Sequence, residues 1–139
     1  MVDAAYRFLM TVWVLWRILR FCMDGIAFQK SKKFAVRIVR LYMYLHDEKR
    51  ESIMSKQLLR CGTSIGANLA EAEYAASKND FQSKAYIALK ETSETLYWLE
   101  LLYNTGYLNA RQYSSMYRDA EEVRRILSAS TKTLRERAE

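Results

Sequence analysis

The sequence predicts an all-α protein: an antiparallel up-and-down four-helix bundle with an additional helical extension at its N-terminus. The chain has no proline and only 4 glycines among its 139 residues, so few positions interrupt a helix. Apolar residues recur every three or four positions along four segments, which is the spacing of amphipathic helices. A chain of this length commonly forms one domain around one core. We therefore expect long helices joined by short turns.

The first 22 residues are predicted to lie outside the bundle domain, which we place at residues 23–139. Residues 8–16 form an apolar run that is too short to span a bilayer, since a spanning helix needs about 20 apolar residues. The segment also lacks the basic start and the small-residue cleavage site of a secretory signal. Two interpretations stay open: an amphipathic helix that lies at an interface or packs as an arm, or an upstream extension without a dedicated role, since Met23 is a second possible start.

The first helix of the bundle is predicted at residues 30–46, where apolar residues recur at spacings of four, three and four. This stripe consists of Phe34, Ile38, Leu41 and Leu45. The polar segment 47–50 ends the helix. The second helix is predicted at residues 51–75 from the same periodicity. Its apolar stripe consists of Met54, Leu58, Cys61, Ile65, Leu69 and Ala72.

Small residues form a separate stripe on the second helix. They are Gly62, Gly66, Ala67 and Ala70. Small side chains let another backbone come close. We therefore expect the second helix to be packed on two sides, within a bundle that assembles as a homo-oligomer.

The boundaries of the third and fourth helices follow from capping residues. Ser77 with Asp80 three residues later resembles a capping box and begins the third helix. Gly106 is expected to end it, and Asn109 is expected to cap the fourth helix. Three apolar residues of the third helix lie off its buried stripe and are predicted to form the oligomer interface. They are Ile87, Trp98 and Leu101.

Positive charge is concentrated in the first half of the bundle. The chain carries a net charge of +6, and residues 29–60 contain nine basic residues against three acidic ones. Residues 61–108 have the opposite balance, with three basic and six acidic residues. A basic helix face can neutralise nucleic-acid phosphates, although an ordinary solvated face is an equal alternative. The candidate phosphate contacts are Lys30, Lys32, Lys33, Arg37, Arg40, Lys56 and Arg60.

Polar residues on the second helix form a candidate structural motif. It consists of Gln57, Ser64, Gly66, Asn68 and Glu71. Asn68 and Glu71 are three residues apart and therefore neighbours on one helix face. A buried Glu71 would need a cationic partner, and Arg60 or an arginine of another subunit could supply it. We favour a role for these two residues in fixing the helix register.

No pattern in the sequence predicts a catalytic, metal or cofactor site. Cys22 and Cys61 have no CxxC spacing, and the single His46 cannot complete a zinc site with them. No nucleophile is placed beside a general base. We therefore predict a protein without enzymatic activity, cofactor or small-molecule substrate, located in the reducing cytoplasm and without a membrane partner.

Several runs of the sequence resemble a bacterial family of four-helix bundle proteins. They are Lys-Phe-Ala-Val-Arg-Ile-Val at residues 33–39, Ser-Lys-Gln-Leu-Leu-Arg-Cys-Gly-Thr-Ser-Ile-Gly-Ala-Asn-Leu-Ala-Glu-Ala at residues 55–72, and Tyr-Trp-Leu-Glu-Leu-Leu-Tyr-Asn-Thr-Gly-Tyr-Leu at residues 97–108. The family includes proteins encoded in intervening sequences of 23S ribosomal RNA genes and the accessory variability determinant of diversity-generating retroelements. The resemblance covers about residues 28–127 and matches the family pattern at Gln57, Arg60, Ser64, Ile65, Asn68 and Glu71.

The resemblance implies a homopentamer with a basic surface that binds nucleic acid and, in the retroelement case, a reverse transcriptase. It implies no enzymatic activity. Our leading hypothesis is a homo-oligomeric bundle that binds RNA or DNA through the basic face, without base-specific readout. The alternative is a scaffold that docks a reverse transcriptase or another acidic protein on the same face.

Overall fold

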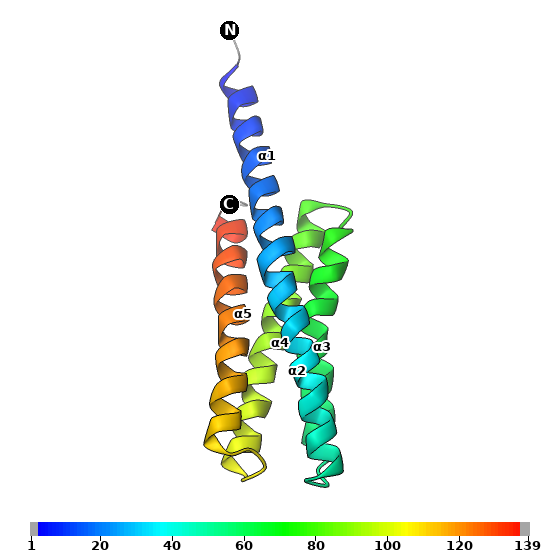
Figure 1. Ribbon diagram of the computed structural model, residues 1–139. Helices are drawn as coiled ribbons and strands as arrows, with labels where there is room; N and C mark the ends of the chain where they lie inside the picture. Colours follow the sequence, from blue (N-terminus) through cyan, green and yellow to red (C-terminus); the bar gives the residue numbers. More distant parts are fainter. Residues whose placement is uncertain (1–2, 137–139) are drawn as a thin grey trace.

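The computed structural model describes residues 3–136, and the side chains of these residues except residue 16 and residues 18–24. The described chain is helical apart from short connections between the bundle helices, and it has no strand (Figure 1). Its elements are α1 (Ala4–Cys22), the π-helical turn η1 (Met23–Ala27), α2 (Phe28–Asp47), α3 (Met54–Glu73), α4 (Lys78–Asn104) and α5 (Ala110–Glu136). The predicted all-α bundle with an N-terminal helical extension is confirmed.

Helices α2 to α5 run alternately up and down, as short connections require. Helix α3 packs closely between α2 and α4, and α4 packs closely against α5. Helices α2 and α5 close the bundle with fewer close backbone approaches. The bundle therefore has three tight seams and one wider seam, between α2 and α5.

The predicted apolar stripes form one continuous core. Its largest fully buried side chains are Phe34, Ile38, Leu45, Leu58, Ile65, Phe81, Leu99, Leu102, Val123, Leu127 and Leu134. All four bundle helices contribute to this set, and Leu41 packs partly buried against it. The periodicity of the sequence therefore identified the inward faces of α2 and α3 correctly.

The predicted helix caps are confirmed. The Ser77 hydroxyl accepts a hydrogen bond from the Asp80 backbone N–H (3.1 Å), and the Asp80 carboxylate accepts one from the Ala76 N–H (3.1 Å). Gly106 ends α4 with φ of +82°, a left-handed conformation that glycine adopts without a Cβ clash. At the start of α5, Asn109 Oδ1 accepts from the Gln112 N–H (2.8 Å) and Gln112 Oε1 accepts from the Asn109 N–H (2.9 Å).

Helix α3 begins later than predicted, because Glu51 caps it instead of joining it. The Glu51 carboxylate accepts hydrogen bonds from the backbone N–H groups of Ile53, Met54 and Ser55, at 2.8 to 2.9 Å. Burial raises the pKa of this carboxyl, but the hydrogen bonds from Met54, Ser55 and Ile53 outweigh it, so the pKa lies below its usual value. Arg50, with φ of 54°, makes the turn that brings Glu51 into place.

The small residues of α3 allow the close approach of α2 that we expected. A Cβ added at Gly62 would lie 2.8 Å from Ile38 Cγ1. A Cβ added at Gly66 would lie 3.3 Å from Ser31 Oγ and 3.8 Å from the backbone N of Lys32. Gly62 is therefore necessary for this seam, whereas Gly66 leaves slightly more room.

Helix α1 continues the line of α2 through η1 and extends beyond the end of the bundle (Figure 1). Its nearest element is η1, the next turn of the same helical rod, and apolar side chains such as Phe8 and Leu9 remain 71% and 65% exposed. The predicted helix in this segment is present, but none of its described side chains belongs to the core.

Candidate nucleic-acid interface

Four of the seven predicted phosphate contacts are exposed cations without a carboxylate partner among the described residues. Lys32, Lys33 and Arg40 lie on the outer side of α2, and Lys56 lies in the first turn of α3. None of these four side chains forms an ion pair with a residue that the structure describes. Their charges are available to an external anion.

The remaining three cations are bound to carboxylates of the chain itself. Lys30 Nζ lies 2.6 Å from Glu122 Oε1, so it bridges α2 to α5. Arg37 also reaches α5, where it pairs with the Asp119 carboxylate and donates to the Ser115 hydroxyl at 2.7 Å. These side chains span the wide α2–α5 seam.

Arg60 forms the corresponding cross-link between α3 and α4. Its guanidinium pairs with Glu94 and lies 3.5 Å from Glu91 Oε2. The pairing with Glu94 raises the pKa of Arg60. Hydrogen bonds from Arg60 and from the Trp98 indole N–H (3.1 Å) lower the pKa of Glu94. Arg60 therefore remains charged, but Glu94 and Glu91 of the same chain balance much of its positive charge.

The α3 motif residues lie mainly on the side of that helix that faces α4. Asn68 is half-buried and donates to the Ser64 carbonyl oxygen at 2.8 Å, while Gln57 Oε1 accepts from Arg60 Nε at 3.3 Å. Glu71 is not buried, so it does not need the partner that the sequence interpretation offered it, Arg60 or an arginine of another subunit. Glu71 is exposed and pairs with Lys84 Nζ at 2.7 Å, because the buried stripe passes through Leu69 and Ala72 on either side of it.

The predicted oligomer-interface residues are only partly exposed. Ile87, Trp98 and Leu101 have intermediate burial on α4, and Trp98 also packs against the core. Glu91 lies on the same helix, and its Oε2 atom is buried without a hydrogen bond in the described part of the chain. Trp98 contacts Tyr97 edge to face, with ring centroids 5.1 Å apart.

The sequence interpretation missed an apolar stripe on the outside of α2. Val36, Val39 and Met43 are 48%, 40% and 54% exposed, and they alternate along the helix with Lys32 and Arg40. Their spacing of three and four residues is a helical signal in its own right, offset from the Phe34–Leu45 core stripe. The outer face of α2 is therefore both basic and apolar.

The described residues contain no group of three His, Cys, Asp or Glu side chains placed to hold a metal ion. Cys61 is buried, and burial, slightly offset by a hydrogen bond from Thr95, raises the pKa of its thiol to about 11. His46 Nδ1 lies 2.8 Å from Asp47 Oδ1 at the end of α2. None of the helices within residues 3–136 is long and apolar enough to cross a membrane.

The model of the 23S rRNA-intervening sequence protein family matches residues 23–129. The chain belongs to this family. Among solved structures, it is similar to a protein of unknown function from the S23 ribosomal protein family of Bacteroides thetaiotaomicron. The two are 52% identical and superpose with a TM-score of 0.77, over 79% of this chain and 98% of the other. The comparison with curated proteins finds no match.

Membership of the 23S rRNA-intervening sequence protein family confirms the predicted resemblance. The match runs from residue 23 to residue 129, so it includes η1, helices α2 to α4 and most of α5, and leaves α1 outside. Neither the family description nor that of the similar structure names an enzymatic activity.

Proposed function

We propose that this protein is a non-enzymatic, cytoplasmic homo-oligomer that binds RNA or DNA phosphates through the outer face of α2 and the start of α3, without reading the bases. The observation that carries the proposal is the set of four exposed cations without a carboxylate partner in the described chain: Lys32, Lys33, Arg40 and Lys56. Several copies in one oligomer would multiply a weak single contact. The family description, which refers to 23S rRNA intervening sequences, is consistent with a nucleic-acid partner.

The structure changes which residues should be tested. Arg37 holds Asp119 and Ser115, so its replacement would disturb the α2–α5 seam as well as any ligand contact. Lys33 and Arg40 have no such partner among the described residues and lie on the same side of α2. They are the appropriate pair for a charge reversal.

The test is fluorescence anisotropy with labelled single- and double-stranded RNA and DNA, titrated across salt concentrations. We expect the affinity to fall steeply with salt. The logarithm of the association constant should decrease by about 0.9 per unit of the logarithm of the salt concentration for each neutralised phosphate of a DNA duplex. The Lys33→Glu, Arg40→Glu variant should bind at least tenfold more weakly and with a smaller slope. The control is Arg111→Glu, Arg118→Glu, which places the same charges on exposed positions of α5. Equal loss in both variants, or no binding at low salt, would contradict the proposal.

Self-association is proposed to use the α4 surface around Ile87, Trp98 and Leu101. These three apolar side chains keep partly exposed surface on α4, away from the fully buried core stripe, and that exposure supports the choice. Size-exclusion chromatography with light scattering measures the mass of the assembly and so the subunit number, which the family resemblance predicts to be five. The variant Ile87→Glu should reduce the mass if this surface is the interface, and Ser114→Glu on exposed α5 should not.

A protein partner is the second candidate, and the mixed character of α2 favours it. Val36, Val39 and Met43 expose apolar surface between the cations, as docking surfaces for proteins do. A reverse transcriptase or another acidic protein would fit such a face. Capture of one defined partner that survives nuclease treatment and is lost in Val39→Glu would favour this function over nucleic-acid binding.

A further inference from the structure

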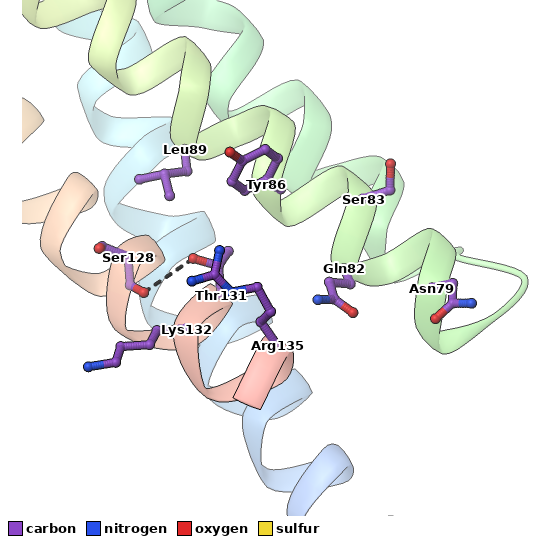
Figure 2. Close-up of a pocket in the computed structure, with 9 residues that line it drawn as sticks. All are labelled: Asn79, Gln82, Ser83, Tyr86, Leu89, Ser128, Thr131, Lys132 and Arg135. Atoms are coloured by element: carbon purple, nitrogen blue, oxygen red, sulfur yellow. Dashed lines mark hydrogen bonds between the residues drawn. The ribbon is translucent and has the colours of Figure 1, made fainter. Parts of the chain in front are cut away.

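A groove between α4 and α5 lies outside every surface described so far. It has a volume of about 620 Å³, and side chains from the first half of α4 and the last turns of α5 surround it (Figure 2). Gln82, Tyr86 and Leu89 come from α4, whereas Ser128, Lys132 and Arg135 come from α5. The size is that of a small-molecule site.

The lining of this groove favours an anion. It contains two cations, Lys132 and Arg135, and no carboxylate. Arg135 forms no ion pair with any residue between 3 and 136, and Lys132 has only a long, exposed one to Glu136 at 3.8 Å. An arginine without a carboxylate partner can donate two parallel hydrogen bonds to a phosphate.

The opposite wall of the groove offers an aromatic ring. Tyr86 is 52% exposed and faces the space between the helices, with Leu89 beside it (Figure 2). Lys90 Nζ lies over this ring, 5.3 Å from its centroid, so a nucleic-acid base can stack only on the opposite ring face. The amide of Gln82 and the hydroxyl of Ser128 add donors and acceptors for a base or a ribose.

We infer that this groove binds a nucleotide, with the base stacked on Tyr86 and the phosphate held by Arg135 and Lys132. The nucleotide can be free or can be one unit of a single-stranded nucleic acid. The groove shares no residue with the proposed phosphate-binding face on α2 and α3. The two proposals can therefore succeed or fail separately.

Isothermal titration calorimetry of the full chain with adenosine 5′-monophosphate tests the inference, with adenosine and inorganic phosphate as partial probes. We expect saturable binding of the nucleotide that is at least tenfold tighter than that of either part. Tyr86→Ala and Arg135→Gln should each weaken it about tenfold. The matched controls are Tyr97→Ala, on the exposed side of the same α4 helix, and Arg118→Gln, on exposed α5; neither should change binding.

Competition with a single-stranded oligoadenylate identifies the source of the nucleotide. An oligonucleotide that displaces the mononucleotide and binds more tightly indicates a nucleic-acid strand, whereas equal affinities indicate a free nucleotide. The absence of saturable binding for both probes at millimolar concentration would overturn the inference. Equal weakening by the groove variants and their controls would overturn it as well. Because Lys33→Glu, Arg40→Glu leaves the groove intact, its effect reports only on the α2 face.

Discussion

The two seams that α2 makes with its neighbours are held by opposite means. Against α3, the absence of a side chain at Gly62 brings the helices together, and Ile38 fills the space where a Cβ would stand. Against α5, long charged side chains reach across a wider gap, as Lys30 does to Glu122 and Arg37 to Asp119. The first seam depends on steric fit, and the second depends on partly exposed charges that salt and water weaken.

This difference has a consequence for function. Cations that bridge α2 to α5 are already neutralised, whereas those that point away from both seams keep their charge for a ligand. Lys32 and Lys33 are direct neighbours of this kind. The geometry of the seams therefore divides the basic residues of this stretch into those paired within the bundle and those exposed without a partner in the described chain.

The largest effect is expected from Gly62→Leu. Its side chain would have to displace Ile38, and overpacking of this kind costs about 3 kcal/mol of the free energy of unfolding. Urea denaturation measures this loss. Gly25→Leu is the control, because nothing lies within 4 Å of a Cβ at that position. A Gly62→Leu protein as stable as the parent would show that the α2–α3 seam is not sterically tight.

A smaller loss is expected from Glu51→Ala, at the turn that joins the two helices of the tight seam. The substitution removes the acceptor for three backbone N–H groups and should cost about 2 kcal/mol. Glu48→Ala, at a nearby exposed residue, should change the free energy of unfolding much less.

The same carboxylate gives the turn a pH dependence. Because the folded pKa of Glu51 lies below its unfolded value of about 4.5, its contribution is complete above that pH and is lost as the pH falls through the folded pKa. Parent and Glu51→Gln proteins should therefore converge in stability below pH 4.5. A difference that stays constant down to pH 2 would contradict this account.

The α2–α5 seam should respond weakly and in a salt-dependent way. Arg37→Ala is expected to cost about 1 kcal/mol, because the ion pair with Asp119 is partly exposed but the hydrogen bond to Ser115 is lost as well. Arg40→Ala, on the same helix without a described partner, is the control and should be near neutral. A double-mutant cycle that combines Arg37→Ala with Asp119→Ala measures the coupling energy of the ion pair, and this energy should decrease at high salt.

The smallest effect is expected from Lys30→Ala. Its pair with Glu122 is exposed on both sides, so we expect a loss below about 0.5 kcal/mol. Lys32→Ala is the matched control. If Lys30→Ala destabilised the bundle as much as Gly62→Leu, the two seams would not differ in the way described here.

Local features of this fold were predictable from the sequence because they depend on near neighbours in the chain. Each of them is set by residues within a few positions of one another. Examples are the apolar stripe from Phe34 to Leu45, the N-terminal cap at Ser77 and the helix end at Gly106. Glu51 was placed in the helix it caps, because a carboxylate before an apolar run is compatible with either role. Glu71 shares a motif with half-buried Asn68 but lies outside the buried stripe, because a helix turns 100° between successive residues.

The sequence by itself determined that this protein is a bundle of four long helices, which face of each is buried and where most of them end, because periodicity and capping are local properties of a helix. Only the tertiary structure decided that Lys30 and Arg37 cross to α5, that Arg60 pairs with Glu94, and that the α4–α5 groove collects cations without carboxylates. Those pairings join residues 34 to 92 positions apart. Which side chains meet at such separations depends on how the helices pack, and no local pattern encodes it.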